Sequence, residues 1–193
     1  MNLSYPGNID ITKSCFSGDH MEDKTAKKKI LWGIPVQFAL GALFHFLYEW
    51  TGENFVIGLF FPVNESIFEH LKLVPLPWLI WWVFAGRNVK EKDRWYTACL
   101  SSVVTALLLM PLSFYFYRYA LNVRLDFINI LLHLFCSAMG QIVGLHFWKH
   151  TKAIKKSISI GIILLLIIAF AVLTIISPKL PLFFDGVSGK FGR

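Results

Sequence analysis

The chain has 193 residues, of which 55% are hydrophobic and 16% are charged, and its formal net charge is +7. The hydrophobic residues form runs of about 20, which excludes an ordinary soluble domain and indicates an all-α, polytopic transmembrane bundle of about five spans. The basic residues lie in the connections between these runs and not in one patch interleaved with aromatic residues, so the charge does not indicate nucleic-acid binding.

The chain divides into three parts by polarity. Residues 1–29 are polar, without helical or strand periodicity, and are expected to form a cytoplasmic tail. Residues 30–177 are expected to form the transmembrane bundle, and residues 178–193 an external tail. The expected spans are 30–50, 64–86, 95–117, 126–148 and 157–177. No small-residue cleavage site follows the first apolar run, so a cleavable signal peptide is not expected.

The first expected span carries a polar stripe. Gln37, Gly41, His45 and Glu49 recur every fourth residue and share one helix face. His45 and Glu49 lie one turn apart, a spacing at which two side chains can share a proton or bind one metal ion. The alternative is that Glu49 only marks the membrane interface while His45 is hydrogen-bonded inside the bundle.

The second expected span places charged residues at membrane depth. Its apolar run, residues 74–86, reaches only about 20 Å against a hydrocarbon core of about 30 Å, so the helix is expected to begin near Asn64. Ser66 and Glu69 fit a capping box at this start. Intramembrane ionisable groups are costly and mark functional sites by default.

Helical geometry from residue 64 onward would place Glu65, Glu69 and Lys72 on one face and turn His70 about 100° away. Paired carboxylates in such an environment share a proton, bind a cation or are neutralised by a neighbour. The simplest alternative is a salt bridge between Glu69 and Lys72. Because Glu65 and Glu69 have only one nearby cation in the sequence, Lys72, a second positive partner is expected for them: a proton, a metal ion or an arginine such as Arg118.

The fourth expected span carries a stripe of polar and small residues: Asp126, Asn129, His133, Ser137, Gly140, Gln141 and Gly144. Helix packing alone explains the glycines, Ser137 and Gln141, whereas Asp126 and His133 remain candidates for a site near the depth of His45. The fifth span, rich in Ile and Leu, is expected to be a lipid-facing packing element. Cys15, Cys99 and Cys136 lack metal or redox spacing and are predicted to be free thiols.

The aromatic residues of the C-terminal tail predict that it folds back over the outer mouth of the bundle. Phe183, Phe184 and Phe191 would otherwise be exposed to water. Anchoring in the lipid headgroups is the alternative.

One motif resembles a known family. The string from Asn64 to Lys72, Asn-Glu-Ser-Ile-Phe-Glu-His-Leu-Lys, is similar to a signature of small bacterial integral membrane proteins of unknown function, with weaker support from residues 47–52 and 181–192. The resemblance covers about residues 30–192. It implies a multi-span bacterial membrane protein and supplies no activity.

Three functions are compatible with these residues. The first is binding or transport of a small solute or ion at a polar site near the outer face, made by His45, Glu49, Asn64, Glu65, Glu69, His70, Asp126 and His133, with a divalent metal held by His45, Glu49, Glu65, Glu69 and His133. The second is a membrane-embedded metal-dependent hydrolase, although the chain lacks His-Glu-x-x-His and a nucleophile motif. The third is a structural or accessory subunit whose polar residues only hold the helices together. The lipid bilayer is an expected partner in all three cases.

The basic residues predict the topology of this multi-pass cell-membrane protein. Thirteen of the 19 Lys and Arg residues precede the first span or lie in the 87–94 and 149–156 connections, so these segments are expected in the cytoplasm. Reporter fusions should therefore show a cytoplasmic N-terminus and an external C-terminus. An external location for residues 87–94 would contradict the whole topology, because it inverts every connection.

Overall fold

The computed structural model describes residues 11–123 and 125–192, with side chains from residue 21 onward except that of Asp126. Within this part every regular element is helical, which confirms the all-α class, and one isolated β-bridge joins Phe184 to Phe191 in the tail.

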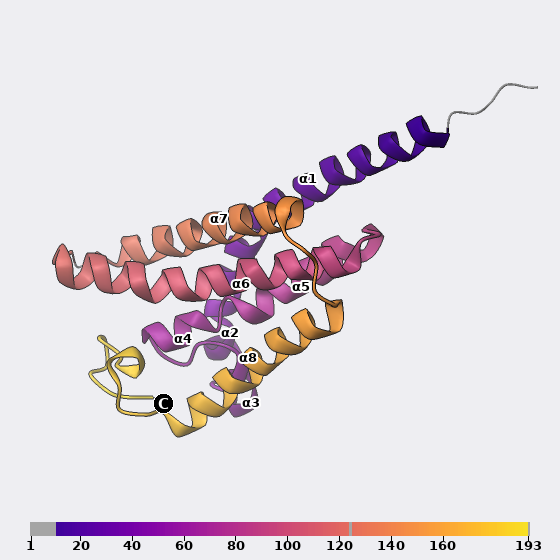
Figure 1. Cartoon of the computed structure of the whole chain (residues 1–193). Helices are drawn as coiled ribbons and strands as arrows, with labels where there is room; N and C mark the ends of the chain where they lie inside the picture. Colours follow the sequence, from indigo (N-terminus) through magenta and orange to yellow (C-terminus); the bar gives the residue numbers. More distant parts are fainter. Residues whose placement is uncertain (1–10, 124, 193) are drawn as a thin grey trace, which may run out of the picture.

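The helices follow the chain as α1 Ile11–His45, α2 Leu47–Trp50, α3 Phe55–Phe60, α4 Ile67–Leu71, α5 Pro75–Ala85, α6 Lys92–Tyr115, α7 Asp126–His150 and α8 Lys156–Ile176, with short turns η1 Gly86–Asn88, η2 Phe116–Ala120 and η3 Pro181–Phe183. Helices α6 and α7 lie side by side along the bundle (Figure 1). Helix α1 packs against α7 and α5, and α8 packs against α6 and α3.

Four segments are long and apolar enough to cross a membrane: Ile67–Asn88, Lys92–Ala120, Phe127–His150 and Lys156–Ile176. They correspond to the last four expected spans. The first expected span, residues 30–50, is not among them. Within it, α1 ends at His45 and Phe46 forms a turn before α2 begins. Membrane crossing by α1 stays a prediction.

Helix α1 begins inside residues 1–29, the segment expected to lack regular structure. Tertiary contacts explain the part from residue 21 onward. The Glu22 carboxylate accepts a hydrogen bond from the Lys90 backbone N–H at 2.7 Å, and Asp23 accepts one from the Trp148 indole at 2.9 Å. Both partners are distant in sequence, so local periodicity could not predict this helical extension.

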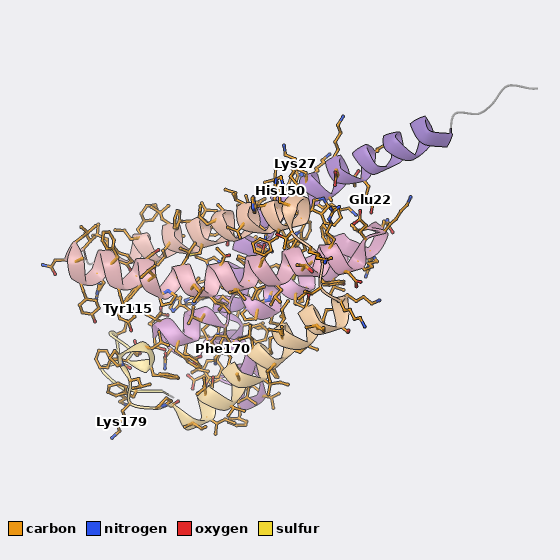
Figure 2. The ribbon with its side chains drawn as sticks, viewed as in Figure 1. Glu22, Lys27, Tyr115, His150, Phe170 and Lys179 are labelled. Atoms are coloured by element: carbon orange, nitrogen blue, oxygen red, sulfur yellow. The ribbon has the colours of Figure 1, made fainter. Side chains whose placement is uncertain are left out.

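The two ends of the bundle carry different connections. Glu22, Lys27 and His150 lie at one end, and Tyr115 and Lys179 lie at the opposite end (Figure 2). The basic segments around residues 27 and 150, both assigned to the cytoplasm by their charge, therefore share one end of the bundle.

Four buried tryptophans fill the core toward the end of the bundle that carries Glu22 and His150. Trp78, Trp82, Trp95 and Trp148 have no exposed surface. The Trp95 indole donates to the Trp82 carbonyl at 2.9 Å, and the Trp95 ring centroid lies 4.5 Å from that of Trp82. Aromatic pairs at this distance contribute about 0.5–1.5 kcal/mol beyond the area that they bury.

Glycine allows α7 to approach its neighbours closely. The Ser102 hydroxyl donates to the Gly140 carbonyl at 2.7 Å, and a Cβ atom on Gly140 would lie 2.6 Å from the Trp78 ring and 2.9 Å from the Ser102 carbonyl oxygen. Ser137 and Gln141 are also buried. The packing interpretation of this part of the α7 stripe is therefore confirmed.

Two of the predicted free thiols are described, and both Cys99 and Cys136 are free and buried. The side chain of Cys15 lies outside the described residues. Burial in apolar surroundings explains why neither described thiol needs a partner.

The C-terminal tail folds back onto α4, as predicted. The Phe183 ring is 5% exposed and stacks on Phe68 with the centroids 4.1 Å apart. Asn64 Nδ2 donates to the Gly192 carbonyl at 2.8 Å. Phe184 and Phe191 stay partly exposed and pair with each other.

The close approach at Gly140 can be tested with Gly140→Ala. We expect this variant to lose about 1–3 kcal/mol of stability, because the added methyl group overlaps the Trp78 ring and the Ser102 backbone. Gly161→Ala on α8 is the matched control, since its added Cβ meets nothing within 4 Å. Unfolding in detergent should show a lower midpoint for Gly140→Ala only, and equal midpoints would contradict the packing argument.

Candidate functional site

The motif between residues 64 and 72 starts a helix later than expected. Ser66 is the N-cap of α4, with an extended backbone of φ −72° and ψ 153°, and its hydroxyl accepts from the Glu69 N–H at 3.3 Å. Asn64 Oδ1 accepts from the Ser66 N–H at 2.9 Å. The helix therefore begins at Ile67, and Glu65 lies in the preceding turn.

This start separates the two glutamates. Because Glu65 precedes the helix, a rotation of 100° per residue does not relate it to Glu69. Glu65 meets His45 and His70, whereas Glu69 pairs with Lys72. The prediction that both carboxylates share one face while His70 points elsewhere is therefore wrong.

His45, Glu65 and His70 form a compact cluster between α1 and the start of α4, called here the His–Glu–His cluster. The Nε2 atoms of the two histidines lie 3.2 Å apart. Glu65 Oε1 lies 3.7 Å from His45 Nε2, and Glu65 Oε2 lies 3.5 Å from His70 Nε2. His45 thus meets two potential metal-binding groups, Glu65 and His70, that lie 20 and 25 residues further along the chain.

The tautomer of His70 follows from its backbone partner. His70 Nδ1 lies 2.9 Å from the Ser66 carbonyl oxygen. A carbonyl oxygen only accepts, so Nδ1 carries the proton, and in neutral His70 the lone pair of Nε2 faces His45 and Glu65. A hydrogen bond of this kind orients metal-binding histidines in known sites.

The spacing of the cluster matches that of ligands around one metal ion. Zinc–nitrogen and zinc–oxygen distances of about 2.0–2.2 Å in a tetrahedron place the donor atoms about 3.3–3.6 Å apart, close to the 3.2 Å between the two histidine nitrogens. Glu65 directs one carboxylate oxygen toward each histidine, at 3.7 Å from His45 and 3.5 Å from His70. Glu65 precedes the apolar segment Ile67–Asn88, and its interaction with His45 lowers the pKa of its carboxyl below the ordinary value. An ionised carboxylate is the form that binds metal.

The cluster borders a cavity of about 440 Å³ between α1, α4, α6 and α7. His45, Glu65, His70, Asn129 and His133 supply its polar groups. The remaining wall is apolar and consists of Phe38, Gly41, Ala42, Phe46, Ile67, Leu73, Met110, Phe114, Ile130, Leu132 and Val187.

Gly41 makes room for His133 at the wall of this cavity. A Cβ atom at Gly41 would overlap His133 Nε2. That nitrogen is buried and has no hydrogen-bond partner within the described part of the chain. Further along both helices, Gln141 Nε2 donates to Gln37 Oε1 at 2.6 Å. Gln37 and Gly41 therefore share one face of α1, as the periodicity indicated, and this face packs against α7.

Glu49 does not belong to this stripe. The turn at Phe46 ends α1, and Glu49 lies exposed on α2. Asn64 connects the motif to the tail through Gly192, while Asn129 accepts a hydrogen bond from the Tyr117 hydroxyl. The side chain of Asp126 lies outside the described residues.

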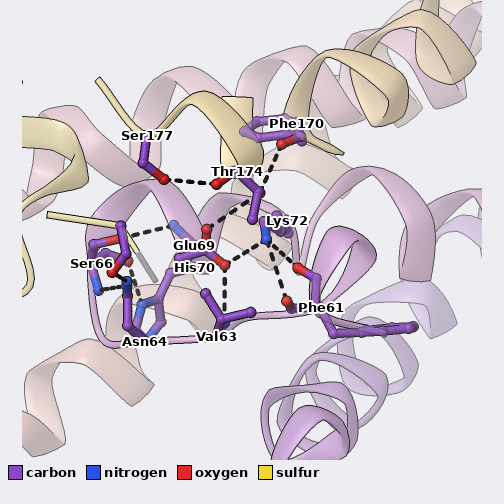
Figure 3. Close-up of polar contacts among 12 residues, drawn as sticks. Phe61, Val63, Asn64, Ser66, Glu69, His70, Lys72, Phe170, Thr174 and Ser177 are labelled. Atoms are coloured by element: carbon purple, nitrogen blue, oxygen red, sulfur yellow. Dashed lines mark hydrogen bonds and ion pairs between the residues drawn. The ribbon is translucent and has the colours of Figure 1, made fainter. Parts of the chain in front are cut away.

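Glu69 and Lys72 form a buried ion pair that connects four segments (Figure 3). Lys72 Nζ lies 2.6 Å from Glu69 Oε2 and donates to the carbonyl of Gly58 at 2.8 Å. The other hydrogen-bond partners of the pair are the Phe61 carbonyl, the Val63 N–H and the Thr174 hydroxyl. The salt-bridge alternative thus describes Glu69, and its partner is Lys72 instead of Arg118.

A family model described as a family of unknown function (DUF6512) matches residues 19–193. The chain belongs to this family. The DUF6512 match begins 11 residues before the resemblance inferred from the motif, and it includes the part of α1 held by Glu22 and Asp23. No curated protein and no solved structure matches the chain.

Sequence reasoning placed His70 in the polar site but outside the metal set, and it did not find the apolar cavity. The signal for His70 was present, since Ser66 is a strong N-cap residue and moves the helix start past Glu65. No feature of the sequence marks Met110 and Phe114 as residues that line a cavity, because apolar residues predominate in every span of this DUF6512 chain.

The buried ion pair predicts a large effect of Glu69→Gln. Removing one partner of a buried pair costs about 3–5 kcal/mol, because the other charge stays buried without compensation. Unfolding should therefore occur at a much lower midpoint, and adding Lys72→Met should restore part of the loss.

Glu91→Gln is the matched control for this variant. Glu91 pairs with Arg94 at the same i, i+3 spacing, but this pair is substantially exposed to solvent. Its loss should cost less than about 1 kcal/mol. Equal effects of the two glutamine substitutions would contradict a structural role for Glu69.

Proposed function

We propose that this protein binds a divalent transition-metal ion at the His–Glu–His cluster, with zinc the best match. The observation that carries the proposal is the convergence of His45, Glu65 and His70, whose ligand atoms all lie within 4.8 Å of one another. Nitrogen and carboxylate ligands of this kind suit zinc and neighbouring transition metals rather than magnesium or calcium.

The arrangement of the surrounding groups supports metal binding. The Ser66 carbonyl fixes the ring of His70, and the Asn64 bonds to Ser66 and Gly192 hold the turn that carries Glu65. The Nε2 atoms of His45 and His70 lie 3.2 Å apart. Without an ion, they can interact only through one shared proton or with the nearby Glu65 carboxylate. A bound cation satisfies all three groups together.

The ion would keep an open coordination position. Three protein ligands leave at least one site for water or a solute, and the cluster lies on the wall of the cavity. The fully buried tryptophans fill the core beyond it, so the arrangement favours binding at one end of the bundle over a continuous pore.

A metal-dependent hydrolase is the second candidate. One observation favours it: two histidines and one glutamate with an open position are typical of catalytic zinc sites. Both candidates require the same ion, so metal binding is tested first.

Metal content is measured on full-length protein purified without a polyhistidine tag. We expect about one zinc per chain and at least a tenfold loss of affinity in His45→Ala, Glu65→Gln and His70→Ala, because each removes a ligand. Thermal unfolding without metal should be little changed in Glu65→Gln, whose side chain is half exposed.

Two controls separate this site from other histidines and acids. Glu49→Gln removes the neighbouring exposed carboxylate, and His146→Ala with His150→Ala removes the histidine pair whose rings lie 4.8 Å apart on α7. Neither should change the zinc content. Absence of stoichiometric zinc, manganese or iron, or binding that Glu65→Gln leaves intact, would contradict the proposal.

A further inference from the structure

We infer that the cavity beside the His–Glu–His cluster binds a single-chain amphiphile with an anionic oxygen head group. The apolar chain would occupy the cavity, and the head group would take the open coordination position of the ion. This inference rests on the proposed metal site and adds its ligand.

The first argument is the shape and composition of the cavity. Its volume of about 440 Å³ lies in the range of about 300–1,000 Å³ that is typical of small-molecule sites. Phe38, Met110, Phe114 and Leu132 line it from three helices, and its polar groups belong to the His–Glu–His cluster and the nearby Asn129 and His133. A ligand that is polar along its whole length would leave most of its groups unpaired there.

The second argument is the rim of the cavity. The lining residues Phe46, Ile130 and Val187 are 48%, 54% and 82% exposed. Ile130 belongs to the apolar segment Phe127–His150, which is long enough to cross a membrane. Where this segment crosses the bilayer, the exposed Ile130 side chain would face lipid, which gives an amphiphile an apolar route from the bilayer into the cavity.

The third argument is charge. A divalent ion with one glutamate and two neutral histidines has a net charge of +1, which is costly near lipid unless an anion offsets it. Among the described residues, no lysine or arginine lines the cavity. The bound ion therefore supplies the positive charge that attracts an anionic head group.

The test uses full-length protein in nanodiscs of neutral lipid, and the probe is the fluorescent fatty acid cis-parinaric acid. We expect saturable binding to the zinc-loaded protein and at least a tenfold weaker affinity after zinc removal by EDTA or in Glu65→Gln. The parinaryl alcohol has the same chain without the anionic group. Its weaker binding should not depend on zinc.

Ile130→Trp tests the cavity itself. The larger ring narrows the rim and should weaken probe binding about tenfold while zinc content stays unchanged. Ile168→Trp is the matched control, because Ile168 on α8 is similarly exposed at 57% and does not line the cavity. It should bind the probe as the parent does.

Competition identifies the head group. Displacement by unlabelled fatty acid points to a carboxylate, and stronger displacement by lysophosphatidic acid points to a phosphate. Equal displacement by inorganic phosphate would overturn the role of the chain. Zinc binding with no probe binding, or with probe binding insensitive to EDTA or to Ile130→Trp, overturns this inference alone, whereas absence of metal binding removes the proposed function as well.

Discussion

The buried charge of Glu69 and Lys72 is the constraint on which the local structure depends. Two ions cannot remain in an apolar bundle unless each is paired and hydrogen-bonded. Lys72 meets this requirement by binding carbonyls at the end of α3, and Glu69 meets it through Val63 and Thr174. The pair thereby fixes residues 58–66 against α4 and α8, and this segment carries Glu65.

The His–Glu–His cluster is built on this fixed segment. Its three members come from the end of α1, the turn before α4 and α4 itself, so their mutual distances depend on tertiary packing. The α1–α7 contact, with Gln37 against Gln141 and Gly41 against His133, sets the position of His45. Structural polar residues and candidate ligands are thus neighbours with different roles: one glutamate neutralises a lysine, and the other faces two histidines.

The sequence predicts four of the five expected apolar spans and most of the polar stripes, because run length and helical periodicity are local properties. The α1 stripe holds as far as His45, and packing along α7 follows from Gly140 and Gln141. The partners of Glu65 and Glu69 could not be read in the same way. A single extended residue, Ser66, breaks the helical phase between them, and the turn at Phe46 removes Glu49 from the stripe in the same manner. The helical part of residues 21–29 depends on partners such as Lys90 and Trp148, which are far away in the chain.

The long sequence separations of these contacts bear on how the protein folds. The Asn64–Gly192 hydrogen bond joins residues 128 positions apart, the Thr174–Glu69 contact spans 105, and the Gln141–Gln37 contact spans 104. A contact between residues so far apart closes a long loop, and the entropy lost on closure opposes its formation. We therefore expect these contacts to form late. Individual helices can enter the membrane early, but the turn that carries Glu65 acquires its final geometry only after α8 and the tail have docked. Until then we expect the two histidines and the carboxylate to be separate groups, so the proposed metal site would be completed only at the last step of assembly.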